Sequence, residues 1–393
     1  MSRPVAGRAG AGGAPTSTPG APTATRIDSE SAFARLKPEW NALLASSRTR
    51  TIFLTWEWIS AWWEAYRAGK ELYVIRVDAG ERLIGIAPLY RRRLRRALGI
   101  GWRVLQPLGD GSYDSDYLDW VAEPGREGEV VGEVAEFLDR HRHDWEMLLV
   151  NEIPDTSPHL PYLRHEGTRR RWISEETPVP CARVRLPGSW DEYLALLKPR
   201  QRTKVRSLLR DVDGSADARF DRCQDREDLA PRLESLFDLH NRRWRAQGRP
   251  GVFEEPAKRA FYAAMSERFL ARDWLRLYSL SVSGRYAAHQ FCFEYDGVLY
   301  LLQEGYDPTF AGSEVGNALR GLVFRDCIAR GLRAYDFLAG VTSHKLAWGS
   351  SVHRSVRLTL ARPTLKSSLS FRAARLKAAL LARRRAPRGE AAP

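Results

Sequence analysis

The segment from residue 298 to residue 349 constrains the fold of this chain more than any other. An apolar run at 298–304 is followed by a glycine-containing loop, a helical pattern that stops at Gly331, a second apolar run at 334–339, and then Lys345. A loop that opens directly into a helix leaves the first backbone N–H groups without acceptors in the helix, and these favour an anion such as a diphosphate. The order predicts a phosphate-binding loop beside two strands.

Four residues of this loop are the ones that we expect to hold the anion: Gly312, Ser313, Gly316 and Asn317. The two glycines leave room for a ligand beside the backbone, and Ser313 is a favourable N-cap for a helix that begins near Glu314. The carboxylate of Glu314 opposes the site, because it competes for the same positive helix end. The competing interpretation is an ordinary capped helix whose small residues serve packing.

Short motifs follow one another in a distinctive order along the chain. In the second half they are Tyr306-Asp307-Pro308-x-Phe310, Ser313-x-x-Gly316, Tyr335-Asp336-Phe337-Leu338-x-Gly340 and Lys345-x-x-Trp348-Gly349. Upstream they are Leu239-His240-x-x-Arg243-Trp244, the Trp-rich run from Phe53 to Trp63, and Leu108-Gly109 followed by Tyr117-x-Asp119. This order resembles the GNAT acetyltransferase superfamily, and within it the cellulose-biosynthesis-associated acetyltransferases, which are akin to the Fem-type peptidoglycan aminoacyltransferases. The chain departs from that branch at Thr342-Ser343-His344-Lys345, where an acidic residue and a tyrosine usually precede the lysine.

The resemblance implies an α/β fold of two tandem GNAT-like lobes, each with a mixed central sheet flanked by helices. We expect four parts: a disordered tail over 1–26, an N-terminal lobe over 27–180 that shapes the acceptor cleft, a C-terminal acyl-CoA-binding lobe over 181–362, and a basic amphipathic tail over 363–393. In the second lobe, the resemblance implies that strands 298–306 and 334–339 splay apart and receive the pantetheine arm of acyl-CoA.

Acyl transfer itself suggests which side chains near the splay carry the chemistry. The reaction needs a base of near-neutral pKa and preorganised donors for the oxyanion. Our candidates, as base, acid toward the CoA thiolate, second base and carbonyl donor, are Glu304, Tyr306, Asp336 and Lys345. Each also has a structural explanation as a strand end, a packed ring, a salt bridge or a solvated charge. His344 and His289 are weaker candidates, because a lone histidine is usually structural.

The charge of the chain is uneven. The formal net charge is +14, and residues 366–393 hold eight Lys or Arg and one acidic residue, about half of that excess. The basic runs at 91–96 and 198–206 suit a phosphorylated acceptor or a solvated face. No nucleic-acid-binding module accompanies them, so we exclude sequence-specific DNA binding.

The cysteines and the lengths of the apolar runs limit the environments in which the protein is expected to work. The four cysteines, at 181, 223, 292 and 327, lack zinc spacing, which predicts reduced thiols and no metal. No run reaches the roughly 20 apolar residues that span a bilayer, and no secretory segment begins the chain, so we expect a cytoplasmic protein.

Two amphipathic patterns have alternative interpretations. Residues 51–66 place Trp56, Ile59 and Trp63 at helical spacing, which favours a core-facing helix over an aromatic platform for sugar rings. In the C-terminal tail, a leucine stripe flanked by Arg and Lys predicts either a solvated helix or a surface helix that contacts an anionic membrane or a partner synthase. The leucines of this stripe are Leu365, Leu369, Leu376 and Leu380.

Together these features predict a GNAT-type acyltransferase. It would transfer an acetyl or other acyl group from acyl-CoA, by direct attack and without a metal, to an amine or hydroxyl of a small molecule or saccharide precursor of the cell envelope or an exopolysaccharide. One alternative is a Fem-like aminoacyltransferase that uses aminoacyl-tRNA, which the basic runs motivate. Another is a non-catalytic scaffold of a polysaccharide synthase, which the departure before Lys345 motivates.

Overall fold

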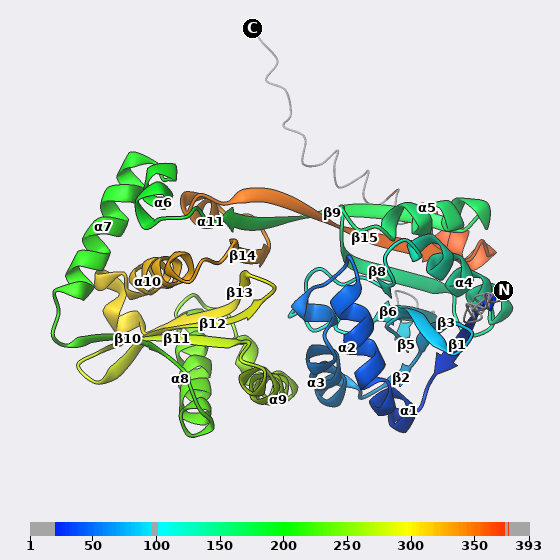
Figure 1. Cartoon of the computed structure of the whole chain (residues 1–393), viewed down its shortest axis with the longest axis horizontal. Helices are drawn as coiled ribbons and strands as arrows, with labels where there is room; N and C mark the ends of the chain where they lie inside the picture. The colour runs from blue at the N-terminus through cyan, green and yellow to red at the C-terminus, as the bar shows by residue number, and fades with distance from the viewer. Residues whose placement is uncertain (1–19, 96–100, 374–375, 377–393) are drawn as a thin grey trace, which may run out of the picture.

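A computed structural model describes residues 20–95, 101–373 and 376 of the 393-residue chain. Two lobes lie side by side along the long axis of the molecule (Figure 1). Each lobe contains strands flanked by helices, so the predicted α/β class with two tandem lobes is confirmed.

The N-terminal lobe is built from residues up to about 172. Its strands are β1 (Pro22–Ile27), β2 (Lys70–Leu72), β3 (Val74–Ala79), β4 (Arg82–Ala87), β5 (Leu89–Arg95), β6 (Gly101–Pro107), β7 (Val121–Ala122) and β8 (Met147–Pro154). Its helices are α1 (Glu30–Arg35), α2 (Lys37–Ser46), α3 (Trp56–Tyr66), α4 (Glu127–Arg140) and α5 (Leu160–Arg169), with a 3-10 turn at Ile52–Leu54. The side chain of Ser29 caps α1 by accepting the N–H of Ala32, as an N-cap serine should.

The C-terminal lobe surrounds its sheet with helices on both faces (Figure 1). Its strands are β10 (Ala218–Arg222), β11 (Leu275–Val282), β12 (Arg285–Tyr295), β13 (Val298–Tyr306) and β14 (Ala334–Ala339). Its helices are α6 (Trp190–Leu196), α7 (Pro199–Asp213), α8 (Arg226–Arg245), α9 (Pro256–Ala271), α10 (Val315–Ala329) and α11 (Ser343–Ala347), with 3-10 turns at Val252–Glu254 and Pro308–Ser313. Helix α7 begins at Pro199, whose missing N–H costs nothing in a first turn.

Two long strands, β9 (Ile173–Arg185) and β15 (Ser351–Ala361), join the lobes into one sheet. They pair antiparallel along the whole of β15, and Figure 1 shows them running together along the top of both lobes. The eleven-stranded sheet has the order β10-β11-β12-β13-β14-β9-β15-β8-β6-β5-β2. A second sheet, β1-β3-β4-β7, belongs to the N-terminal lobe alone.

The boundary expected at residue 180 lies inside β9, so the lobes share a continuous strand there rather than a linker. Pro178 and Pro180 lie where β9 pairs only with β15. Pairing with β14 begins at Cys181. A proline without an N–H is tolerated on that side, because no partner strand needs the donor.

The expectation of disorder is wrong for residues 22–26, which form most of β1. This strand pairs antiparallel with β3, with Pro22 opposite Ala79 and Ile27 opposite Val74. Thr23, Thr25 and Ile27 are β-branched, which favours an extended backbone, and β3 supplies the hydrogen-bonding partner that composition does not reveal. Residues 1–19 lie outside the described part of the chain.

The four tryptophans of α3 are buried, so this helix is core and the alternative of a sugar platform on it is wrong. The indole N–H groups of Trp58 and Trp62 donate to the hydroxyl oxygens of Ser115 and Ser112, at 2.9 and 3.0 Å. The ring of Trp58 also lies 5.2 Å from that of Phe261 in α9, centroid to centroid. Helix α3 therefore forms part of the contact between the lobes.

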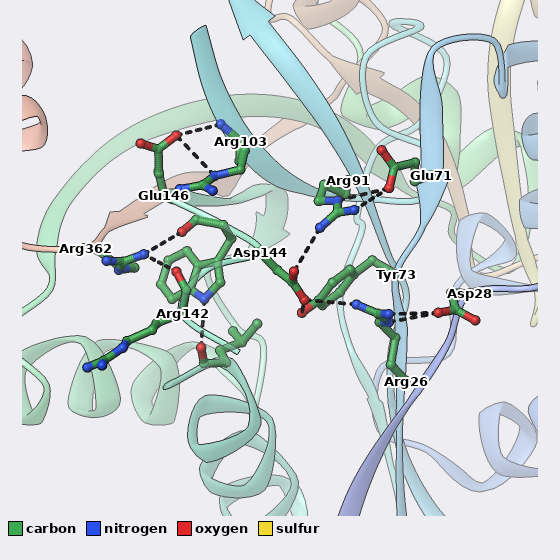
Figure 2. A network of polar contacts seen from close by, with 12 residues as sticks. Arg26, Asp28, Glu71, Tyr73, Arg91, Arg103, Arg142, Asp144, Glu146 and Arg362 are labelled. Atoms are coloured by element: carbon green, nitrogen blue, oxygen red, sulfur yellow. Dashed lines mark hydrogen bonds and ion pairs between the residues drawn. The ribbon is translucent and has the colours of Figure 1, made fainter. Parts of the chain in front are cut away.

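A charged network holds the two sheets of the N-terminal lobe together (Figure 2). Asp144, between α4 and β8, accepts hydrogen bonds from Arg26 Nη1 of β1 at 2.9 Å, Arg91 Nη1 of β5 at 3.1 Å, and Tyr73 Oη at 3.1 Å. Because β1 and β5 belong to different sheets, the carboxylate of Asp144 connects them.

The described start of the C-terminal tail is helical from residue 365 and packs onto the N-terminal lobe. Phe371 is buried in a cluster with Trp102 and Met147. The stripe leucines within the described residues are exposed, namely Leu365, Leu369 and Leu376. Leu380 lies outside the described residues, and the role predicted for the tail stays a prediction.

Across the described ranges, no helix combines the length and apolar character needed to cross a membrane. All four cysteines are free and buried. No cluster of His, Cys, Asp and Glu side chains within those same ranges has the arrangement of a metal site.

Gly305→Ala tests how closely α8 lies on β13. A Cβ at this position would lie 2.8 Å from the backbone N of His240 and 3.2 Å from the carbonyl oxygen of Leu236, so α8 must shift. We expect the free energy of unfolding in urea to fall by about 1–3 kcal/mol. Gly312→Ala is the control, because nothing lies within 4 Å of its Cβ position. Equal stabilities of the two variants would contradict the close contact.

Candidate functional site

Strands β13 and β14 part soon after they meet. They pair in parallel only between Val298–Tyr300 and Ala334–Asp336, which confirms the predicted splay. The carboxylate of Asp336 accepts the N–H of Leu338 at 2.8 Å, and Leu338 has a left-handed backbone with φ 61°. This local turn follows the last residue that pairs with β13 and coincides with a register shift in the pairing of β14 with β9.

Two cavities adjoin the splay. The loop cavity, of about 220 Å³, lies at the N-terminus of α10 and includes Gly316, Asn317 and Tyr306 in its lining. The splay cavity, of about 240 Å³, lies between β13 and β14 and includes Tyr113 and Asp116 of the N-terminal lobe. Glu304 borders both cavities, so they are neighbours along β13.

The start of α10 differs from the prediction. Glu314 is its N-cap residue and has a left-handed backbone, with φ 47° and ψ 38°. Ser313 instead closes the 3-10 turn Pro308–Ser313, so the predicted Ser313 cap is wrong. A capping serine needs an extended backbone, which that turn does not provide. Gly316 and Asn317 line the loop cavity, whereas Gly312 and Ser313 do not.

A carboxylate lies at the open end of α10. Oε2 of Glu314 is 2.5 Å from Nζ of Lys204 in α7 and accepts from Nδ2 of Asn317 at 2.7 Å. The hydrogen bond from Lys204 is the main cause of a lowered pKa of the Glu314 carboxyl. The helix end thus attracts negative charge, as its dipole requires, and Glu314 already supplies part of that charge.

An ion pair between buried Arg320 and half-buried Glu304 lies between the two cavities. Arg320 is 2% exposed and donates from Nη2 to Glu304, while Arg243 Nη1 lies 3.6 Å from Oε1 of Glu304. Burial raises the pKa of the Glu304 carboxyl, but Arg320 and Arg243 outweigh burial and lower it overall. A carboxylate held ionised by two guanidinium groups accepts protons poorly, so this placement favours a counter-ion over the predicted base.

The carboxylate of Asp336 is fully buried and anchors the two lobes to each other. It accepts from Tyr117 Oη of the N-terminal lobe at 3.0 Å and from Arg183 Nε of β9 at 2.6 Å. It does not line either cavity. The position therefore favours an anchoring role over that of a second base.

Tyr306 and Lys345 lie at opposite parts of the splay. Tyr306 lines the loop cavity, with the guanidinium of Arg243 over its ring at 5.6 Å. Lys345 lines the splay cavity and donates from Nζ to the carbonyl oxygens of Phe337 and Ala339, at 2.7 and 2.8 Å. Burial lowers the pKa of the Lys345 ammonium. An ammonium has three N–H donors, so one is left for a substrate.

The two histidines have structural contacts. Nε2 of His344 lies 3.0 Å from Arg320 Nη1 and 3.1 Å from Asn317 Oδ1, beside the loop cavity. His289 is fully buried, with its two ring nitrogens each 2.9 Å from a serine hydroxyl. Both histidines also line the loop cavity.

Asp116 is the site residue that the sequence does not single out. It lies in the loop between β6 and β7, is 8% exposed, and lines the splay cavity together with Lys345. Burial, reinforced by Glu152 and Asp336, raises the pKa of its carboxyl to about 8. A carboxyl that titrates near neutral pH is suited to general-base catalysis. The motif Tyr117-x-Asp119 indicates this loop, but Asp116, which precedes the motif, is buried only because the two lobes pack together.

The comparisons with known proteins agree with this geometry. Residues 199–346 match the family model described as an acetyltransferase (GNAT) domain, a range that runs from α7 to α11. The second lobe of the chain therefore carries a GNAT acetyltransferase domain.

Solved structures show the same fold over almost the whole chain. The crystal structure of FemX has a TM-score of 0.59 at 10% identity, covering 83% of this chain and 96% of that one. The C-terminal domain of a putative lysylphosphatidylglycerol synthetase from Agrobacterium fabrum has a TM-score of 0.51 at 10% identity, covering 87% and 96%. Similarity at such identities concerns the fold alone. No curated protein sequence matches this chain.

Asp336→Ala distinguishes an anchor from a base. Removing the carboxylate leaves Arg183 and Tyr117 without their buried partner, and we expect the free energy of unfolding in urea to fall by about 3 kcal/mol. The control is Asp213→Ala, which breaks a half-exposed pair with Arg325 and should cost about 1 kcal/mol or less. A variant of Asp336 that keeps its stability and loses only turnover would restore the catalytic assignment.

Proposed function

We propose that this protein transfers an acetyl or other acyl group from acyl-CoA to an amine or hydroxyl of a saccharide precursor of the cell envelope or an exopolysaccharide. The observation that carries the proposal is the pair of adjoining cavities along β13, one at the start of α10 and one beside Asp116. The first suits the carrier of an acyl group, and the second suits the group that attacks it.

The loop cavity fits a diphosphate at its helical end. The first turn of α10 offers N–H groups. Gly316 has no side chain to cover them, and a Cβ at this position would lie 3.5 Å from the ring of Tyr306. Asn317 would add an amide donor, and Lys204 would add a cation once it leaves Glu314. The pantetheine arm would lie between β13 and β14, where their pairing has ended.

The splay cavity supplies the groups that acyl transfer needs. Asp116 would accept the proton that the attacking amine or hydroxyl loses as its new bond to the acyl carbon forms. Lys345 would donate its remaining N–H to the carbonyl oxygen, where negative charge develops. As the carbon–sulfur bond breaks, Tyr306 would return a proton to the thiolate from the adjoining loop cavity.

A second candidate donor is aminoacyl-tRNA. Helices α7 and α10 run in the same direction, since Lys204 meets Glu314 and Asp213 meets Arg325. The first half of α7 also exposes basic side chains, among them Arg200 and Arg206. A basic helix beside the donor cavity suits an RNA backbone. Aminoacyl transfer that needs charged tRNA, with no turnover of acyl-CoA, would favour this candidate.

Calorimetric titration with acetyl-CoA tests the donor. We expect micromolar binding to the full chain and no heat with Gly316→Glu, because a carboxylate in the first turn of α10 would repel the diphosphate and fill the cavity. Gly132→Glu in α4 is the matched control, since its Cβ position has nothing within 4 Å, and it should bind as the unmodified chain does. Equal heats from all three proteins would remove the loop assignment.

The pH dependence of turnover tests Asp116. Only the ionised carboxyl accepts a proton, so kcat/KM should rise with pH and level off above about 8. We expect Asp116→Asn to lower kcat/KM by roughly 10²–10⁴-fold and to lose this rise. A pH profile that is the same in both proteins would contradict the assignment.

Stability provides a readout of Asp116 that needs no substrate. Its pKa is raised in the folded state, so the folded protein keeps a proton that the unfolded chain has released above pH 4 or so. The resulting contribution to the free energy of unfolding is complete below the unfolded pKa and is lost as pH rises toward 8. Asp116→Asn should remove this part of the pH dependence.

A further inference from the structure

The loop between β6 and β7 presents one aromatic side chain to solvent beside the splay cavity. Tyr113 is 94% exposed and lines that cavity together with Asp116. Its backbone is left-handed, with φ 62°, a conformation that is uncommon for a bulky residue. The ring therefore contributes almost nothing to the core, although the left-handed backbone of Tyr113 is conformationally unfavourable.

The residues on either side of Tyr113 are fixed by both lobes. Ser112 accepts from Trp62 of α3 through its hydroxyl, at 3.0 Å, and from Nζ of Lys258 in α9 through its carbonyl, at 2.9 Å. Asp114 accepts from Nζ of Lys258 at 2.9 Å and from Tyr262 Oη at 3.1 Å. Lys258 and Asp114 are both buried, so this clamp is rigid.

The clamp extends to both ends of the loop. Ser115 accepts from Trp58 Nε1 at 2.9 Å, and the side chain of Asp110 accepts from Nδ2 of Asn151 at 2.7 Å. A strained backbone costs of order 1–3 kcal/mol and persists where its surroundings over-determine it, most often at ligand sites. Here the surroundings hold the loop so that Tyr113 projects.

The neighbours of Tyr113 indicate the chemistry of a ligand. The face of a tyrosine ring is apolar and carries negative potential, which suits the C–H face of a saturated ring. The same cavity offers a carboxyl from Asp116, an amide from Gln303 and an ammonium from Lys345. Beside it, Glu152 is buried, and its Oε2 has no hydrogen-bond partner among the described residues. A ring with an apolar face, polar edges and an amine combines these requirements.

We propose that Tyr113 is the acceptor platform of this protein: an amino sugar stacks on its ring and directs the amine into the splay cavity toward Asp116. The inference rests on the proposed function and names the class of its acceptor. The exposed ring supplies stacking, and the rigid loop keeps the ring in place before the acceptor arrives. Ordering the platform in advance avoids an entropic cost on binding.

Saturation-transfer NMR with D-glucosamine as the probe tests the platform on the full chain. We expect saturation of the sugar ring protons with the unmodified protein and with Tyr113→Phe, which keeps the aromatic face. Tyr113→Ala should lower that saturation at least fivefold. Tyr162→Ala is the matched control, because Tyr162 is a partly exposed tyrosine on α5 outside the cavity, and it should leave the signal unchanged.

Two outcomes would overturn the inference: no saturation of D-glucosamine by the unmodified protein, or equal saturation in Tyr113→Ala. Tyr113→Gly guards against a folding defect, because glycine adopts φ 62° freely. It should melt at the same or a higher temperature and still lose the saturation.

The donor proposal fails separately from the platform. Absence of heat with acetyl-CoA would remove the acyl-CoA donor, while the NMR result would still decide whether Tyr113 contacts the sugar. Unchanged acetyl-CoA binding by Tyr113→Ala, together with lost saturation, places the ring on the acceptor alone.

Discussion

The site depends on the buried carboxylate of Asp336. It accepts the Leu338 N–H at the point where β14 stops pairing with β13, at the start of the gap that both cavities adjoin. The same carboxylate accepts from Tyr117 of the N-terminal lobe and from Arg183 of β9. One buried carboxylate therefore lies at the start of the gap and anchors the two lobes to each other. Such a charge is stable inside a protein only when its partners satisfy it, which couples the lobes to the splay.

The charged and titratable side chains around the two cavities differ. Around the loop cavity lie Lys204, Arg243 and Arg320 and the positive end of α10. Around the splay cavity lie Asp116 and Glu152, whose carboxyls are buried by the N-terminal lobe and have raised pKa values. The Arg320–Glu304 pair lies between these regions and separates their fields.

The sequence predicted the individual elements well where a local signal exists. The helical spacing of tryptophans marked α3 as core. The glycine-loop-helix order and the two strands beside it were recognisable as the centre of a GNAT domain. Local signals failed where pairing with another strand decides the outcome. Strand β1 forms because β3 pairs with it, and β9 continues through Pro178 and Pro180 because β14 does not pair with these two residues.

The sequence by itself determined the order of the strands and helices, since hydrophobic periodicity, glycine positions and capping residues act over a few neighbours in the chain. The class of chemistry followed from the resemblance of the motif order to the GNAT superfamily. Tertiary structure alone decided the environment of each carboxyl group near the site. Glu304 lies between two guanidinium groups, Asp336 is sealed between the lobes, and Asp116 is left facing the gap with its pKa raised. The proton affinity of a carboxyl depends on burial and on charges a few ångströms away, and residues far apart in the chain supply both.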